Sequence, residues 1–309
     1  MTTESSPGLT STPNKQPAYY AAWQRGDERV REDISQETFN YFKAIRLQLI
    51  AALDIEENYN GLIERYHKFQ KELLDVLLST TVTYPAGWDH LRVCSQRLDR
   101  ELISLFSAAR QYIDQSAHLY KITEVEEAAQ VQTWFSIEYD ARLGYRVCEA
   151  LRNVSQHRLL PTQSLTVGGE WRDKERGVRT HSMKLYLRPA VLVEDEKFKR
   201  SVLRELTELG EKTEVVPLLR EYLNGLATVN GKIRASLENP IDEWSSRIRA
   251  FLKDRLENLD HDAVYLLGSH GAPPETDRVP LFNNLVKRLD KLRRHNSSGE
   301  RAFDYEVVL

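Results

Sequence analysis

The amino-acid sequence predicts a mainly α-helical protein that has one β-hairpin in its second half and further helices after the hairpin. Two observations support this prediction. Between about residues 35 and 160, apolar residues recur at spacings of three and four, which is the period of a helix with one buried face. Between residues 163 and 188 the period changes to two, which is typical of β-strands. The length of 309 residues makes two domains the expected number.

Composition and charge limit the classes of function. Hydrophobic residues make up 41% and charged residues 29% of the chain, as is ordinary for a globular protein. The formal net charge of −3 provides no overall positive field, so a nucleic acid would have to bind to a local basic surface. No apolar run is long enough to cross a bilayer, so we expect no membrane partner.

The N-terminus and the cysteines indicate the compartment. Residues 1–17 lack the basic start and the apolar stretch of a secretory signal, and their Ser, Thr and Pro content predicts a disordered tail over residues 1–18. The two cysteines, Cys94 and Cys148, lie in helical patterns among apolar neighbours, and we expect buried thiols in a reducing compartment. The expected location is therefore the cytoplasm. No metal site or other cofactor is expected.

The helical half is predicted to contain four helical stretches. Ser35 caps the first, a second runs from about residue 60, and a long third follows the break at residues 84–87. Thr123 and Glu126 are expected to form a capping box that opens the fourth. The fourth stretch is expected to kink near Ser136 and to run to His157, because Pro161 would stop it.

The second half begins with the predicted hairpin. Residues 163–172 and 178–188 alternate apolar and polar side chains around a polar turn at residues 173–177. Helical patterns then cover about 195–209, 213–236, 240–257 and 279–294. The apolar run at 263–267 fits either a strand or a helix end, and residues 268–275 are predicted to form a loop.

The end of the fourth helical stretch carries the residues of greatest chemical interest, Arg152-Asn153-Val154-Ser155-Gln156-His157. On an ideal helix Glu149, Asn153 and His157 lie four residues apart on one face. Arg152 points roughly 140° away from His157 by the same geometry. Either the long arginine side chain reaches round a distorted last turn, or a second copy of the helix completes the site.

This segment resembles the signature of the HEPN superfamily, in which an Arg, usually followed by a polar residue, precedes a His near the end of a bundle helix. The resemblance covers approximately residues 35–160 and implies that residues 19–160 form a HEPN-like helical bundle. The hairpin and C-terminal helical region, residues 161–309, lie outside the family core. The resemblance further implies a metal-independent endoribonuclease that acts on RNA as a homodimer. It also implies a toxin or phage-defence role, with an antitoxin or defence-system protein as partner.

The residue types suit RNA cleavage, because RNA supplies its own nucleophile, the 2′-OH. His157 would act as general acid/base, since its ordinary pKa lies near working pH. Arg152 would clamp the phosphate and stabilise the charge of the transition state through its planar fork of donors. Asn153 would orient His157 or the phosphate. By analogy with the family, the product would be a cyclic phosphate.

Several alternatives stay open. The chain has four Arg/His pairs of similar spacing, and the context of the helix end and Asn153 singles out the pair at 152 and 157. Arg152 and His157 could simply complement the carbonyl groups of a solvated helix end. Arg146 and Arg158 are candidates for substrate binding on a basic strip, or they are ordinary surface charge among neighbouring acids. A non-catalytic helical scaffold that binds RNA or a protein is the alternative function.

Overall fold

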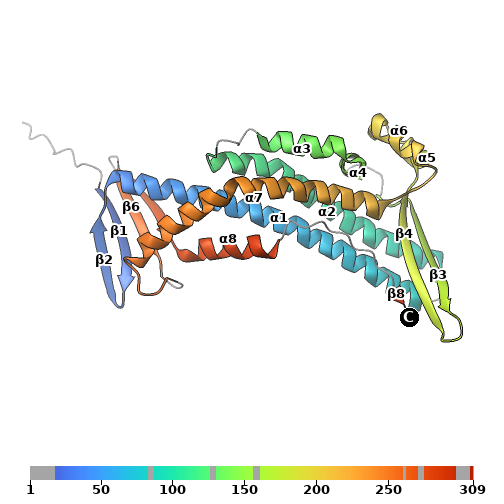
Figure 1. The fold of residues 1–309 in the computed structure, drawn as a ribbon, viewed down its shortest axis with the longest axis horizontal. Helices are drawn as coiled ribbons and strands as arrows, with labels where there is room; N and C mark the ends of the chain where they lie inside the picture. The colour runs from blue at the N-terminus through green and yellow to red at the C-terminus, as the bar shows by residue number, and fades with distance from the viewer. Residues whose placement is uncertain are drawn as a thin grey trace, which may run out of the picture. The chain divides into compact units, whose positions relative to one another are not determined.

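The computed structural model describes residues 18–82, 87–125, 130–155, 161–259, 262–270, 275–296 and 307–308. The protein is mainly helical and has two small antiparallel sheets, which confirms the predicted fold class at this level (Figure 1). Residues 1–17 of the predicted tail lie outside the described residues, and residue 18 begins a strand. Within the described ranges, no helix combines the length and the apolar character needed to span a membrane.

The chain divides into two compact units. The smaller unit combines Met1–Leu47 with Glu243–Val286, and the larger unit combines Gln48–Asp242 with Lys287–Leu309. The domain boundary expected near residue 160 falls inside the larger unit. Three helices contribute residues to both units: α1 (Gln36–Val82), α7 (Val215–Lys253) and α8 (Asn283–His295).

The smaller unit contains a four-stranded antiparallel sheet. Its strands are β1 (Ala18–Arg25), β2 (Glu28–Asp33), β6 (Val264–His270) and β7 (Glu275–Leu281), in the order β2-β1-β6-β7. The helical bundle was expected to start at residue 19, but residues 19–25 and 28–33 form the strands β1 and β2. Five of the six β2 residues are exposed and most are charged, so β2 shows no apolar alternation in the sequence.

The core of the smaller unit joins segments from both ends of the chain. The rings of Phe42 and Phe251 lie 4.3 Å apart, and both side chains are buried. The Arg255 guanidinium donates hydrogen bonds of 2.9 and 2.8 Å to the two carboxylate oxygens of Glu32. Residues 264–267, which the sequence left open between a strand and a helix end, belong to strand β6. The loop predicted at 268–275 is partly wrong, because residues 268–270 belong to β6 and Glu275 begins β7.

Helix α1 combines the first two predicted helices into one. Ser35 does cap it, since the Thr38 amide donates a 3.0 Å hydrogen bond to Ser35 Oγ. The break expected before residue 60 is wrong, because the apolar stripe continues through Ala52, Ile55 and Tyr59, all buried. Gly61 also lies within the helix.

Helix α2 (Trp88–Ile122) is the predicted third helix, and two shorter helices follow it. Thr123 is the C-cap of α2, and its hydroxyl donates a hydrogen bond to the Tyr120 carbonyl. Thr123 therefore does not open the next helix as the capping box required; Glu126 lies outside the described residues. The predicted fourth stretch is divided into α3 (Gln130–Ala141) and α4 (Leu143–Ser155), so the break falls at Arg142 and not near Ser136.

The predicted hairpin is confirmed as β3 (Ser164–Asp173) and β4 (Val178–Leu187). Strands β5 (Thr213–Glu214) and β8 (Val307–Val308) both pair with β4, and helices α5 (Pro189–Leu192) and α6 (Arg200–Glu208) follow the hairpin. Helix α7 runs through Pro240, so the two helices predicted at 213–236 and 240–257 are one. Leu237 and Ile241, on either side of the proline, are buried, and their packing offsets the backbone hydrogen bond that proline cannot make.

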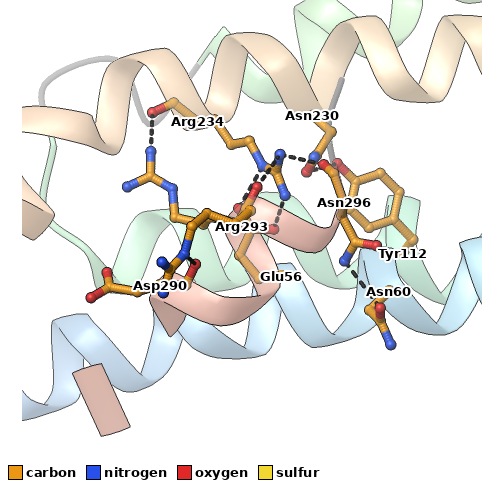
Figure 2. A network of polar contacts seen from close by, with 9 residues as sticks. Glu56, Asn60, Tyr112, Asn230, Arg234, Asp290, Arg293 and Asn296 are labelled. Atoms are coloured by element: carbon orange, nitrogen blue, oxygen red, sulfur yellow. Dashed lines mark hydrogen bonds and ion pairs between the residues drawn. The ribbon is translucent and has the colours of Figure 1, made fainter. Parts of the chain in front are cut away.

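A buried polar network joins α1 and α7 within the larger unit (Figure 2). The Arg234 guanidinium donates to both Glu56 carboxylate oxygens, at 2.7 and 2.5 Å, and their side chains are 12% and 5% exposed. Arg234 also donates to the backbone carbonyl of Asn296. The side-chain amide of Asn296 in turn donates a 3.1 Å hydrogen bond to Asn60 Oδ1. Each group finds a partner on another segment, so the network favours one particular packing of these helices.

Candidate active site at the end of helix α4

Helix α4 places the candidate residues by its amphipathic pattern. Its apolar face is buried and includes Val147, Ala150, Leu151 and Val154. The positions between these residues leave Glu149 and Arg152 half-buried and Asn153 exposed on the last two turns. The described part of the helix runs to Ser155, whose hydroxyl donates a 3.0 Å hydrogen bond to the Arg152 carbonyl.

The Arg152 side chain turns toward the helix face that carries Glu149 and Asn153. Its Nη2 donates a 2.7 Å hydrogen bond to Asn153 Oδ1, and its Nε lies 3.6 Å from Glu149 Oε2. The side chain is 19% exposed, and its buried Nε has no hydrogen-bond partner among the residues that the structure describes. Arg152 thus contacts two residues of the helix face on which an ideal helix would place His157. His157 itself lies outside the described residues, so the choice between one chain and two for the complete site stays open.

Glu149 is the centre of the cluster. Its Oε1 accepts a 2.7 Å hydrogen bond from the Tyr222 hydroxyl on α7, and its Oε2 also lies 3.6 Å from the Arg110 guanidinium on α2. Burial raises the pKa of the Tyr222 phenol well above its ordinary value, and the negative charge of Glu149 adds to that shift. Tyr222 thus stays a neutral donor, and the carboxylate holds two guanidinium groups near one helix end.

Arg146, a predicted substrate-binding residue, makes structural contacts. Its guanidinium donates hydrogen bonds of 3.3 and 2.5 Å to the two carboxylate oxygens of Glu205 on α6. It also donates to the backbone carbonyls of Tyr139 and Asp140, at 3.2 and 2.5 Å. These four hydrogen bonds link α3, α4 and α6, and they occupy donors that would otherwise contact a substrate.

A buried carboxyl group fixes the chain just beyond the candidate site. Asp99 on α2 is 1% exposed, and its Oδ1 accepts a 2.7 Å hydrogen bond from the backbone amide of Thr162. Burial raises the pKa of Asp99 to about 6, although its hydrogen bonds from Thr162 and Ser95 act in the opposite direction. Ser155 and Thr162, which lie on either side of the segment that carries His157, are therefore both held by hydrogen bonds.

Two predicted site residues, His157 and Arg158, fall within residues 156–160 and lie outside the described residues. The other Arg/His pairs have different surroundings. Arg176 lies in the hairpin turn, whereas Arg255 and Arg288 are ion-paired with Glu32 and Glu57 respectively. The structure therefore places only the first of the four arginines at the end of a short helix within the larger unit.

The sequence did not indicate Tyr222, Arg110 or Asp99 as part of this region. Tyr222 and Arg110 lie on other helices, and only packing brings them to Glu149. Only Asp99 could have been noticed in the sequence, because this carboxylate directly follows Leu98 on the buried stripe of a long helix.

The chain matches no family model, no curated protein and no solved structure. Among the described residues, no group of three or more His, Cys, Asp or Glu side chains is arranged to hold a metal ion.

Proposed function

We propose that the protein is a metal-independent endoribonuclease in which Arg152 clamps the scissile phosphate and His157 is the general acid/base. One observation supports this proposal above the others. The Arg152 guanidinium contacts Asn153 and Glu149, the two residues that share the helix face expected for His157. The arginine that looked misdirected on an ideal helix is thus turned to the face where the reaction would take place.

The contacts of Arg152 suit a phosphate clamp. Glu149 and Asn153 hold the guanidinium in place before substrate arrives, which lowers the entropy that binding must remove. The guanidinium would bind the phosphate and stabilise the additional charge as the 2′-OH attacks phosphorus. His157 would take the 2′-OH proton or supply a proton to the departing 5′ oxygen, which yields a cyclic phosphate and a free 5′-OH.

The proposal extends to a homodimer that faces two α4 helices across one RNA strand, in a toxin or phage-defence role with a protein that restrains it. In this proposal Arg152 and His157 of one chain share the helix face that carries Glu149 and Asn153. A dimer would then pair two complete sites.

The experiment measures cleavage of a mixed-sequence single-stranded RNA in EDTA. We expect cleavage by the wild type and a loss of about a hundredfold or more in His157→Ala, the usual size of an acid–base contribution. Arg152→Ala is expected to lose cleavage to a similar extent. His181→Ala is the matched control, because His181 follows Arg176 at the same spacing but lies on a strand.

Unchanged cleavage in His157→Ala would remove His157 from the mechanism. The second candidate function is a non-catalytic scaffold that binds RNA or a protein, and the ion pair of Arg152 with Glu149 favours it, since such a pair can simply fasten a helix end. RNA binding by the wild type without any cleavage would support the scaffold.

A further inference from the structure

A pocket of about 330 Å³ opens within the larger unit, and none of its described lining residues belongs to α4. Its walls come from α1, from β4 and β5 of the second sheet, and from the start of α7. The lining combines apolar and polar side chains, and its apolar members are Leu73, Leu74, Leu77, Met183, Val216 and Pro217. A pocket with apolar walls and a few polar groups is the usual form of a small-molecule site.

Gln70 is the polar group that points to a ligand. It lines the pocket from α1 and is 3% exposed. Neither its amide nitrogen nor its amide oxygen has a hydrogen-bond partner within the described part of the chain. A buried amide without partners costs free energy, commonly about 1–3 kcal/mol, so a ligand that pairs with both atoms would recover that cost.

Three charged side chains are among the described residues that line the pocket. Lys184 and Arg220 contribute two cations and Glu214 one anion, and Lys184 Nζ lies 3.7 Å from Glu214 Oε2. Helix α7 begins at Val215, so the positive end of its dipole lies at the same wall. A ligand that combines a flat apolar body, one edge with a donor beside an acceptor, and a negative group would match all three features.

We propose that this pocket binds an adenine nucleotide, with the Gln70 amide paired to the edge of the base. A glutamine amide accepts from the N6 amino group of adenine and donates to the adjacent ring nitrogen, which satisfies both of its unpartnered atoms. The aliphatic side chains contact the faces of the ring, and the phosphate lies toward Lys184 and Arg220. This inference does not depend on the proposed ribonuclease activity.

The experiment is calorimetric titration of the full chain with AMP and with a short single-stranded oligoadenylate. Binding of AMP identifies a free nucleotide as a sufficient ligand, and binding of the oligoadenylate alone identifies a nucleotide within an RNA strand. Gln70→Met, which keeps the side-chain volume, is expected to weaken binding by about ten- to a hundredfold. Purine riboside monophosphate, which lacks the N6 amino group, is expected to bind the wild type correspondingly weakly.

Gln111→Met is the matched control, because Gln111 is exposed on α2 and donates to Asn58 outside the pocket. Its affinity for AMP should equal that of the wild type. The proposal is overturned if neither AMP nor oligoadenylate binds the wild type at millimolar concentration, or if Gln70→Met binds as tightly as the wild type. Equal affinity for AMP and purine riboside monophosphate would also overturn it. His157→Ala should keep full affinity, so failure of the ribonuclease proposal is seen separately.

Stability without ligand provides a second measurement. If the Gln70 amide exists to bind a ligand, Gln70→Met removes an unsatisfied group and should raise the urea midpoint of the free protein. A lower midpoint would show that the amide stabilises the fold itself, which contradicts the proposal.

Discussion

At the scale of single residues, Asp99 is the most informative carboxyl group of the larger unit. It is buried on α2, and its pKa of about 6 lies above the ordinary value of 3.8. A raised pKa means that the folded protein holds this proton more tightly than the unfolded chain does. The stabilising effect is therefore complete below about pH 4 and is lost as the pH rises through about 6.

Asp99→Asn should remove this pH dependence while it keeps an acceptor for the Thr162 amide. Since one pKa unit corresponds to about 1.4 kcal/mol, the stability of the wild type relative to the variant should fall by up to about 3 kcal/mol between pH 4 and pH 7. Urea denaturation of both proteins at several pH values measures this difference. A difference that stays constant with pH would contradict the assignment of Asp99.

The sequence placed some residues of the candidate motif side by side but not the contacts of Arg152. The sequence indicated Arg152, Asn153 and Glu149 because they are neighbours on one helix, where geometry is regular. It did not predict which way the flexible arginine turns, because that choice depends on the position of Glu149, which Tyr222 and Arg110 help to hold.

At the scale of elements, the packing of α4 on α7 depends on a close approach at Gly144. A Cβ at this position would lie 2.2 Å from the Leu218 carbonyl oxygen and 2.6 Å from Glu221 Cβ. The Gly144 amide also donates a 2.8 Å hydrogen bond to Glu221. The sequence shows only a glycine inside a helical pattern, and the reason for it lies on α7.

Gly144→Ala should therefore destabilise the protein by at least about 2 kcal/mol, because backbone atoms must move. Gly61→Ala is the matched control. Gly61 lies within α1 with nothing within 4 Å of an added Cβ, so this substitution should stabilise the protein by up to about 1 kcal/mol. Chemical denaturation measures both. Equal effects of the two substitutions would argue against the close contact at Gly144.

The buried ion pair between α1 and α7 should matter more than an exposed one on the same helix. Glu56→Gln leaves the Arg234 guanidinium buried without its counter-charge, and we expect a loss of about 3–5 kcal/mol. Glu57→Gln breaks the pair with Arg288, where both side chains are about half exposed, and should cost less than about 1 kcal/mol. If the two variants unfold at the same urea concentration, the Glu56–Arg234 pair does not stabilise the larger unit.

At the scale of the whole molecule, the two thiols report on the larger unit. Cys94 and Cys148, the only cysteines of the chain, are both buried there, and burial raises the pKa of each. We expect a thiol reagent at pH 8 to label neither cysteine in the native protein and both in urea, since the reactive form is the exposed thiolate. Rapid labelling without denaturant would show that the larger unit opens readily.

Local period by itself determined the helical class, the hairpin at residues 164–187 and the presence of a helix around Arg152, because these patterns depend on neighbours in the chain. Tertiary structure decided the rest. Strand β1 pairs with β6 from the other end of the chain, and such a partner leaves no mark in a local pattern. The continuity of α7 through Pro240 depends likewise on the burial of Leu237 and Ile241. The direction of the Arg152 side chain depends on the Glu149 carboxylate, which is contacted by Tyr222 on α7 and Arg110 on α2. The free energies of these contacts between distant segments depend on the folded arrangement, so a local sequence pattern does not contain them.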